Sequence, residues 1–351
     1  MAQRPAESDM SGRDMSNAGT GSFEASVVET SSAEARAEPT DAAPDAPDAS
    51  RAEGERAPVA SGPVKVVAVF GPTASGKTEV AEAVAERIGT EVVSADAMQV
   101  YRGLPILTNQ PARPTRLVGI CSLDEEMSLG AYASLAHAAI DELVERHGTA
   151  VVAGGTGLYL RAALVDLAVP PRAEPELRGR IEREVDHDRS AAHRRLEGLD
   201  PHTAEVVHPN DRQRLIRALE LAERGHTLAG GDRLWSTAMR LPTLVAGLEV
   251  SATELEQRIR ARTVAMFERG VAREVRAALV GPVSRTAQKT LGLREISELE
   301  EPEALERVVV RTRRYAVYQR KWMRRIPGIV LVDAGRDRGA VADEIVARAR
   351  L

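Results

Sequence analysis

Apolar and polar positions along the chain fall into blocks that predict strands and helices. Residues 64–70 form a short apolar, β-branched run, which predicts a buried strand of a parallel sheet. A glycine-rich turn and an amphipathic helix over about 77–88 follow. Further strands are predicted at 91–96, 116–120 and 149–153, and a helix at 131–146. Because strands alternate with helices, we expect a parallel, doubly wound α/β sheet.

The pattern changes after the paired prolines Pro170 and Pro171. Charged helical sequence with few β-branched residues runs to about His208 and predicts a helical insertion. A strand-like apolar run returns at 243–250, and helices are predicted from about 253 and over about 302–325. We therefore expect a disordered tail at 1–60, the first part of the α/β core at 61–171, the helical insertion at 172–208, the second part of the core at 209–335 with a basic helix, and a C-terminal helix or tail at 336–351.

The first 60 residues differ from the rest of the 351-residue chain in composition and charge. They are rich in Ala, Pro, Ser, Asp and Glu, contain one aromatic residue, Phe23, and cannot bury enough apolar surface to offset chain entropy. An overextended start is the alternative, because Met10 and Met15 could also initiate translation. The chain carries a net charge of -5, but 12 acidic and 5 basic residues in this segment leave the remainder mildly basic. A nucleic-acid partner is therefore allowed but not required.

Other features of the composition indicate an expected compartment. No run reaches the roughly 18 apolar residues of a membrane helix, and the start lacks the order of a signal peptide. The single cysteine, Cys121, permits neither an internal disulfide nor a cysteine zinc cluster, which suits a reducing environment. We expect a cytoplasmic protein with no membrane contact.

A phosphate-binding loop follows the first predicted strand. The sequence fits G-x-x-x-x-G-K-[ST] and opens a helix, as the mechanism requires; its residues are Gly71, Pro72, Thr73, Ala74, Ser75, Gly76, Lys77 and Thr78. Backbone amides of residues 73–78 and the helix N-terminus would face phosphate oxygens, Lys77 would add a positive charge, and Thr78 could hold Mg²⁺. The loop indicates a polyphosphate ligand without saying which one. The expected fold class is thus α/β, with a P-loop NTPase-like parallel sheet flanked by helices and a helical insertion.

The acid that such loops usually require is not where a nucleotide hydrolase would have it. The best candidate strand ends in Gly154 and Gly155 with no carboxylate, whereas an NTPase places a magnesium-binding Asp there. Asp96 follows another predicted strand, at the edge of the sheet where open α/β folds bind ligands. Asp96 is therefore a candidate metal ligand or catalytic base, with a solvated strand-end carboxylate as the alternative.

The motifs from residue 67 to about 325 resemble those of the bacterial tRNA dimethylallyltransferase (tRNA isopentenyltransferase) family. Besides the phosphate loop, the resemblance is carried by Ser94–Tyr101, Gly154–Leu160, His208–Glu220 and Thr312–Trp322. It implies transfer of a dimethylallyl group from dimethylallyl diphosphate to the N6 amine of the adenine 3′-adjacent to the anticodon, with release of diphosphate. The phosphate loop would then hold dimethylallyl diphosphate rather than a nucleotide, and Asp96 would be the base.

The resemblance also implies roles for further residues. Thr156 and Arg262 are expected beside the diphosphate or the reacting centre, as catalytic residues with Asp96. Contacts with tRNA are expected from Asp96, Ala97, Met98, Gln99, Arg178, Gln213, Arg214, Leu215, Ile216 and Arg217. The expected partners are the tRNA anticodon stem-loop and dimethylallyl diphosphate, the cofactor is Mg²⁺ held by Thr78, and the protein is expected to be a monomer.

This chain departs from the family pattern between residues 104 and 117. Leu104–Pro111 stands where the family usually shows a Gly-Thr-Ala-Lys-Pro run, and Thr115 and Arg116 stand where paired histidines are common. Ala97 also replaces a frequent Ser. These departures affect the expected RNA contacts near that loop and leave the phosphate chemistry intact.

The last predicted long helix carries a basic stripe. The residues Arg307, Arg311, Arg314, Tyr318, Lys321 and Arg325 recur on one helical face. No acid lies between its first and last member, which favours RNA phosphates over an ordinary solvated face. Val308, Tyr315 and Trp322 lie on a neighbouring face and are expected to pack on the core rather than stack on bases.

Three other functions remain open from the sequence. A P-loop small-molecule kinase would share the core, and an adenylate isopentenyltransferase would share the chemistry but modify a free nucleotide. The insertion at 172–208 and the Gln213–Arg217 segment favour tRNA over the free nucleotide. A nonenzymatic RNA-binding protein is disfavoured by the presence of Lys77, Asp96 and Thr156.

Overall fold

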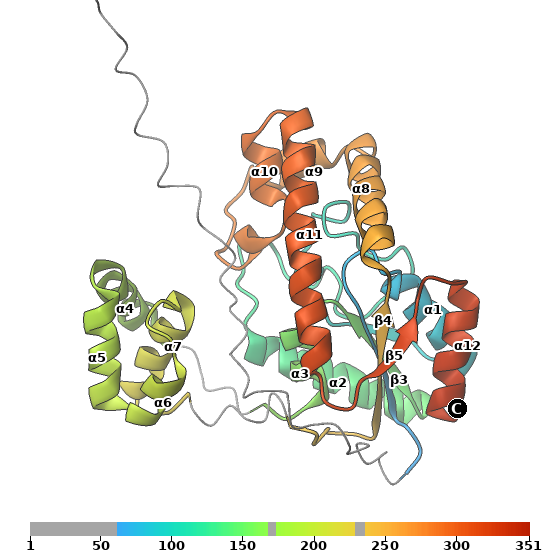
Figure 1. Cartoon of the computed structure of the whole chain (residues 1–351), viewed down its shortest axis with the longest axis horizontal. Coiled ribbons are helices and arrows are strands. Elements are labelled where there is room, and N and C mark those ends of the chain that lie inside the picture. Colours follow the sequence, from blue (N-terminus) through green and yellow to red (C-terminus); the bar gives the residue numbers. More distant parts are fainter. Residues whose placement is uncertain (1–61, 168–172, 229–235) are drawn as a thin grey trace, which may run out of the picture. The chain divides into compact units, whose positions relative to one another are not determined.

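A five-stranded parallel sheet forms the centre of the fold (Figure 1). The structure, a computed structural model, describes residues 62–167, 173–228 and 236–351, so the predicted tail at 1–60 lies outside the described residues. The strand order is β2-β3-β1-β4-β5, and the strands are β1 (Val66–Phe70), β2 (Val92–Ser94), β3 (Ala150–Gly154), β4 (Thr243–Glu249) and β5 (Val330–Asp333). The predicted α/β class with a parallel sheet is confirmed.

Both faces of the sheet are covered by helices because its strands are apolar on both faces. Alternate β1 residues, such as Val67 and Val69, pack in a cluster with α1 (Lys77–Ile88) and α12 (Arg338–Ala349). The intervening residues pack in a second cluster with α2 (Leu129–His147) and α3 (Gly157–Leu164). Phe70 is level with Gly154 of β3 and with Gly247 of β4, so the loops after these strands leave the sheet together.

One predicted strand is absent from the sheet, and one strand of the sheet was not predicted. Residues 116–120 do not form a strand: Arg116 makes one isolated bridge to Val93, and then Leu117 and Gly119 adopt positive φ, which ends extended pairing. The strand β5 was not predicted, although residues 329–332 form a short apolar run, Ile-Val-Leu-Val. The C-terminal segment predicted as a helix or tail contains the helix α12.

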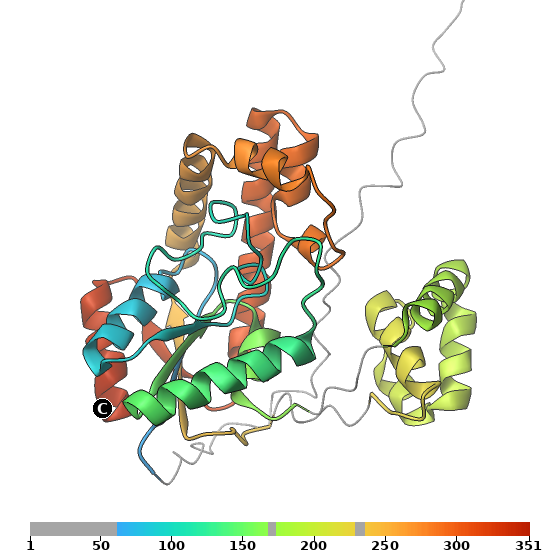
Figure 2. The same ribbon diagram turned by 180° about the vertical axis from the view of Figure 1, so that it is seen from behind.

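A helical layer lies at the carboxyl edge of the sheet. It consists of α8 (Ala252–Glu268), α9 (Val271–Ala278), α10 (Leu293–Glu298) and α11 (Glu301–Arg325). The long segment between β2 and α2 runs as a loop beside these helices (Figure 2). Leu104 and Leu107 of this loop pack with Met266 of α8 and Val308 of α11. This packing places a loop from the first part of the chain against helices from the last.

The insertion has a hydrophobic core of its own. Its helices are α4 (Pro175–His187), α5 (Arg189–Leu199), α6 (Pro201–Val206) and α7 (Arg212–Ala222). Ile181 of α4, Leu196 of α5 and Leu215 of α7 share one buried cluster. Because α7 packs with α4–α6, the helical unit continues past residue 208, where the sequence analysis placed its end. None of the helices in the described part of the chain is long and apolar enough to cross a membrane.

Candidate active site

The phosphate loop joins β1 to α1 through a tight turn. Ala74 and Gly76 both adopt positive φ, at 63° and 87°, which turns the backbone toward the first turn of α1. Gly71 allows this closure, because a Cβ at that position would lie 2.6 Å from Ser75 Oγ. Ser75 Oγ is itself buried without a hydrogen-bond partner among the described residues. The loop therefore surrounds a small space with donors, as an anion site requires.

A cavity of about 420 Å³ opens in front of this loop. Its polar end is formed by the phosphate loop and by residues from other elements that carry charge, namely Asp96, Arg258, Arg262 and Arg338. Its remaining wall includes the apolar side chains Leu107, Ile259, Met266, Leu291 and Val308. The cavity thus combines a charged end with an apolar wall, which fits a phosphorylated ligand that carries an apolar group.

Lys77 and Arg262 are buried cations at the charged end of the cavity, and Asp96 is a carboxylate that acts on both. Burial lowers the pKa of Lys77 to about 8; Asp96 acts to raise this pKa, and Arg262 acts to lower it further. Burial also lowers the pKa of Arg262, which Asp96 partly offsets. Burial outweighs the attraction of Asp96 and Glu79 for these two cations, so their charges are incompletely compensated. An added anion would therefore be stabilised here.

Asp96 lies in the loop directly after β2. Its Oδ1 accepts a hydrogen bond of 3.0 Å from the Met98 amide, which holds the carboxylate in a turn at the edge of the cavity. The amide of Ala97, which directly follows Asp96, donates a hydrogen bond of 3.2 Å to Thr156 Oγ1 in the loop after β3. The predicted catalytic pair Asp96 and Thr156 is thus brought together through adjacent strands, and Arg262 joins them from α8.

Four residues of α11 line the cavity, namely Val308, Thr312, Tyr315 and Gln319, and the sequence analysis did not assign them to the site. Tyr315 lies with its hydroxyl 3.4 Å from Thr156 Oγ1, and Gln319 lines the cavity one helical turn later. Tyr315 was expected to pack on the core rather than stack on bases; it is instead partly exposed and lines the cavity. The available signal was the spacing of four residues inside the C-terminal signature, which puts both side chains on one helical face.

The predicted tRNA segment after β2 lies at the cavity. Asp96, Met98 and Gln99 line it, and Ala97 is held by Thr156. Gln99 is fixed on both sides, because its Oε1 accepts from Ser94 Oγ at 2.9 Å and its Nε2 donates to Asn109 O at 3.0 Å. The segment is therefore positioned by the fold before any RNA binds.

The residues of the predicted tRNA segment on α7 fall into a buried group and a partly exposed group. Leu215 and Ile216 are fully buried in the core of the helical unit, so direct contact of these two side chains with tRNA was a wrong prediction. Gln213, Arg214 and Arg217 are partly exposed. Buried Glu220 accepts from Arg217 at 3.0 Å and from Arg178 of α4 at 2.8 Å. Arg178 therefore also holds α4 against α7, whereas Arg217 pairs with Glu220 within α7.

The basic stripe of α11 is partly neutralised. Arg311 pairs with Glu295, and Arg307 pairs with Glu303 at 3.6 Å. Arg314 and Lys321 are exposed. The absence of acids between Arg307 and Arg325 therefore overstated the free positive charge of the stripe, because acids from α10 and from the first turn of α11 pair with it.

Magnesium ligands in this site would come from few protein atoms. Thr78 and Asp96 line the cavity, whereas the described residues contain no cluster of three or more His, Cys, Asp or Glu side chains that could hold a metal ion. A hydroxyl and a carboxylate next to a phosphate site are hard oxygen donors, and Mg²⁺ is usually bound by one or two such groups together with substrate phosphates. The residues present fit that mode.

Comparison with known proteins supplies the family. Residues 99–326 match the family described as IPP transferase, and residues 64–118 match the family described as isopentenyl transferase. A tRNA dimethylallyltransferase of Anaeromyxobacter dehalogenans is 39% identical over 303 residues, which span 81% of this chain and 100% of the relative.

Solved structures agree in fold. The full-length tRNA isopentenylpyrophosphate transferase of Bacillus halodurans is 29% identical, with a TM-score of 0.59 over 82% of this chain and 97% of that chain. A eukaryotic dimethylallyltransferase described as acting on tRNA is 25% identical, with a TM-score of 0.64 over 77% of this chain and 74% of that chain.

Proposed function

The chain belongs to the IPP transferase family, and from this premise we propose that it transfers the dimethylallyl group of dimethylallyl diphosphate to the N6 amine of the adenine 3′-adjacent to the anticodon in tRNAs, with release of diphosphate. The observation that carries this proposal is the single cavity that joins Lys77 and Arg262 to a carboxylate and to an apolar wall. A diphosphate with a short apolar tail matches both halves of this cavity.

The reaction breaks the allylic carbon–oxygen bond and forms a bond from that carbon to N6. The bonding electrons leave with the diphosphate, and N6 loses one proton. Lys77, Arg262 and the amides at the start of α1 would stabilise the negative charge that develops on the leaving oxygen. Asp96 would orient the amine and accept its proton. Each step is thus assigned to a residue that lines the cavity.

We assign the tRNA contacts beside the reacting amine to the segment Asp96–Gln99. An adenine in a helix is stacked, so it must turn out of the loop to reach Asp96, and this is cheaper from a single-stranded loop than from a duplex. Because Gln99 is held by hydrogen bonds to Ser94 and Asn109, its side chain is already in position to contact the base.

We assign Mg²⁺ to Thr78, with the diphosphate oxygens as its other ligands. When bound, the ion would neutralise part of the diphosphate charge. A chelator should lower turnover, and Thr78→Ala should raise the Mg²⁺ concentration needed for half-maximal rate, while Thr90→Ala, at a threonine outside the cavity, should not. A Thr78→Ala variant with the metal dependence of the wild type would remove Thr78 as a ligand.

The decisive experiment supplies dimethylallyl diphosphate and either an anticodon stem-loop with adenine at the target position or free AMP. Mass spectrometry of the nucleosides should show N6-dimethylallyladenosine from the stem-loop and not from AMP. Product from AMP alone would instead support an adenylate isopentenyltransferase. Formation of ADP from ATP and a small acceptor, without prenylated product, would support a kinase.

A further inference from the structure

Gln319 connects the two loops that form the active site. Its Oε1 accepts a hydrogen bond of 2.7 Å from the amide of Thr73 in the phosphate loop. Its Nε2 donates a hydrogen bond of 2.8 Å to the carbonyl of Gly155 in the loop after β3. The side chain is 2% exposed, so both bonds are shielded from water. One amide thereby joins the loops after the neighbouring strands β1 and β3.

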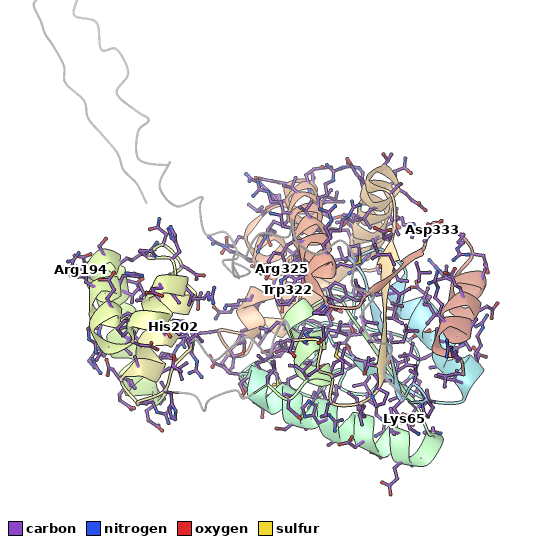
Figure 3. The ribbon with its side chains drawn as sticks, turned by 60° about the horizontal axis from the view of Figure 1, so that its bottom comes forward. Lys65, Arg194, His202, Trp322, Arg325 and Asp333 are labelled. Carbon is purple, nitrogen blue, oxygen red and sulfur yellow. The ribbon has the colours of Figure 1, made fainter. Side chains whose placement is uncertain are left out.

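The loop after β3 is shaped for this contact. A Cβ at Gly155 would lie 2.3 Å from Gln319 Nε2, so any side chain there would displace the amide. Two residues on, a Cβ at Gly157 would lie 2.3 Å from the ring of Trp322. Trp322, labelled on α11 in Figure 3, lies one helical turn after Gln319. The helix is therefore held against the loop on both sides of Thr156, and Gln319 projects from a rigid position.

Gln319 also stands between the two chemical halves of the site. On one side, the hydroxyl of Thr73 accepts a hydrogen bond of 2.8 Å from Arg262. Gln319 therefore binds the residue that positions this cation for the leaving group. On the other side, Thr156, next to Gly155, accepts from the amide of Ala97, beside Asp96. A shift of Gln319 would change the distance between the diphosphate and the base.

The contact also removes one donor from the phosphate cradle. The Thr73 amide is directed at Gln319 Oε1 and is not available to a phosphate oxygen. The sequence-based expectation that the amides of residues 73–78 all face phosphate was therefore wrong at its first member. The Ser75 amide is also engaged, because it donates a hydrogen bond of 3.1 Å to the carbonyl of Pro72.

We propose that Gln319 is a positioning residue, which fixes the separation between the diphosphate cradle and the amine-binding loop. This inference rests on the proposed prenyl transfer. A displacement of about 1 Å in a reacting geometry can cost about 10²-fold in rate, so two lost hydrogen bonds at this junction should act mainly on the chemical step.

The test compares Gln319→Met, which keeps the length and loses both polar groups, with Gln319→Glu, which keeps the acceptor for Thr73 and lacks the amide donor for Gly155. Single-turnover rates at saturating substrates should fall about 10²-fold in Gln319→Met and at least tenfold in Gln319→Glu. The affinity of Gln319→Met for inorganic diphosphate should fall about fivefold, as expected from loss of one net hydrogen bond of about 1 kcal/mol. Affinity for tRNA should be unchanged.

The control is Gln288→Met, the same chemical change at an exposed glutamine that donates to Val283 O and does not line the cavity. Its rate should equal that of the wild type. Rates are measured well below each unfolding temperature, because a purely structural role would lower that temperature and leave the rate per folded molecule unchanged. A wild-type rate per folded molecule together with wild-type diphosphate affinity, in either Gln319 variant, overturns the proposal.

Failure of the proposed function has a different signature. In that case the wild type would bind diphosphate without modifying the stem-loop, and the affinity ratio between wild type and Gln319→Met would decide the positioning role by itself. Equal affinities would then refute it.

Discussion

Arg262 donates a hydrogen bond of 2.8 Å from Nη1 to the hydroxyl of Thr73, a residue 189 positions earlier in the chain. The bond attaches a guanidinium from α8 to the phosphate loop after β1. Burial desolvates Arg262 before any ligand arrives and lowers its pKa, so its charge would act strongly on a leaving diphosphate.

We expect Arg262→Gln to lower the single-turnover rate by about 10²–10³, the loss typical of removing one preorganised donor from a developing negative charge. Affinity for tRNA should change little. Arg260→Gln is the control, because Arg260 lies on the same helix, is exposed and pairs with Glu306 outside the cavity. Equal rates in the two variants would show that Arg262 does not act on the leaving group.

Replacement of Asp96 tests the base. Asp96→Asn should lower the single-turnover rate by about 10²–10⁴, because the amide cannot accept the N6 proton, while tRNA affinity stays within a few-fold. Asp333→Asn is a matched control: Asp333 ends β5, accepts from Gly335 N at 2.9 Å and does not line the cavity (Figure 3). Full recovery of Asp96→Asn at high Mg²⁺ would instead identify Asp96 as a metal ligand only.

The affinity for diphosphate should depend on the protonation of Lys77. The pKa of Lys77 in the free protein is about 8, and a bound anion stabilises the ammonium and raises this pKa. Below pH 8 the charged form dominates in both states, so affinity is constant. Above pH 8 binding requires proton uptake, and affinity should fall by up to about tenfold per pH unit. Calorimetry with inorganic diphosphate and a chelator, in two buffers, measures both quantities.

Lys77→Arg provides the comparison for this pH profile, because arginine stays charged across the range. The fall in affinity above pH 8 should disappear in that variant, whereas Lys65→Ala, at a lysine that does not line the cavity, should retain it. A fall of equal slope in Lys77→Arg would assign the titration to another group.

Glu274 should stabilise the loop where this chain departs from its family. Its carboxylate accepts the Ile106 amide at 2.8 Å and the Leu107 amide at 2.8 Å, and Leu107 lines the cavity. Glu274→Gln replaces one acceptor oxygen by a donor, so we expect a loss of about 1.5–3 kcal/mol in the free energy of unfolding and a higher KM for dimethylallyl diphosphate. Chemical denaturation of this variant and of Glu268→Gln, an exposed glutamate outside the cavity, provides the comparison.

Some parts of the fold could be predicted because they depend on short stretches of chain. Residues 77–88 form α1 as predicted, since their apolar positions recur with the helical period. The buried strand β1 is apolar throughout, and β4 is apolar between Thr243 and Glu249 at its two ends, so both are marked by their composition. The predicted strand at 116–120 failed because Leu117 and Gly119 adopt positive φ, which apolar composition does not reveal.

The boundary of the helical unit was misplaced for a different reason. The amphipathic pattern of residues 212–222 predicts a helix but does not say which core will bury it. Leu215 and Ile216 pack with α4–α6, so residues expected to contact tRNA serve instead as the core of the insertion.

By itself, the sequence determined the phosphate loop, the family and the candidate roles of Lys77, Thr78 and Asp96, because these depend on contiguous motifs whose chemistry is set by residue type and local backbone. The resemblance already implied Arg262, but only the tertiary structure decided which distant contacts Arg262 and Gln319 make in the site. Gln319 meets Thr73 across 246 residues and Gly155 across 164, and Arg262 meets Thr73 across 189. Such contacts depend on how α8 and α11 pack over the carboxyl edge of the sheet, and the periodicity of each helix specifies its buried face without specifying the partner it will meet.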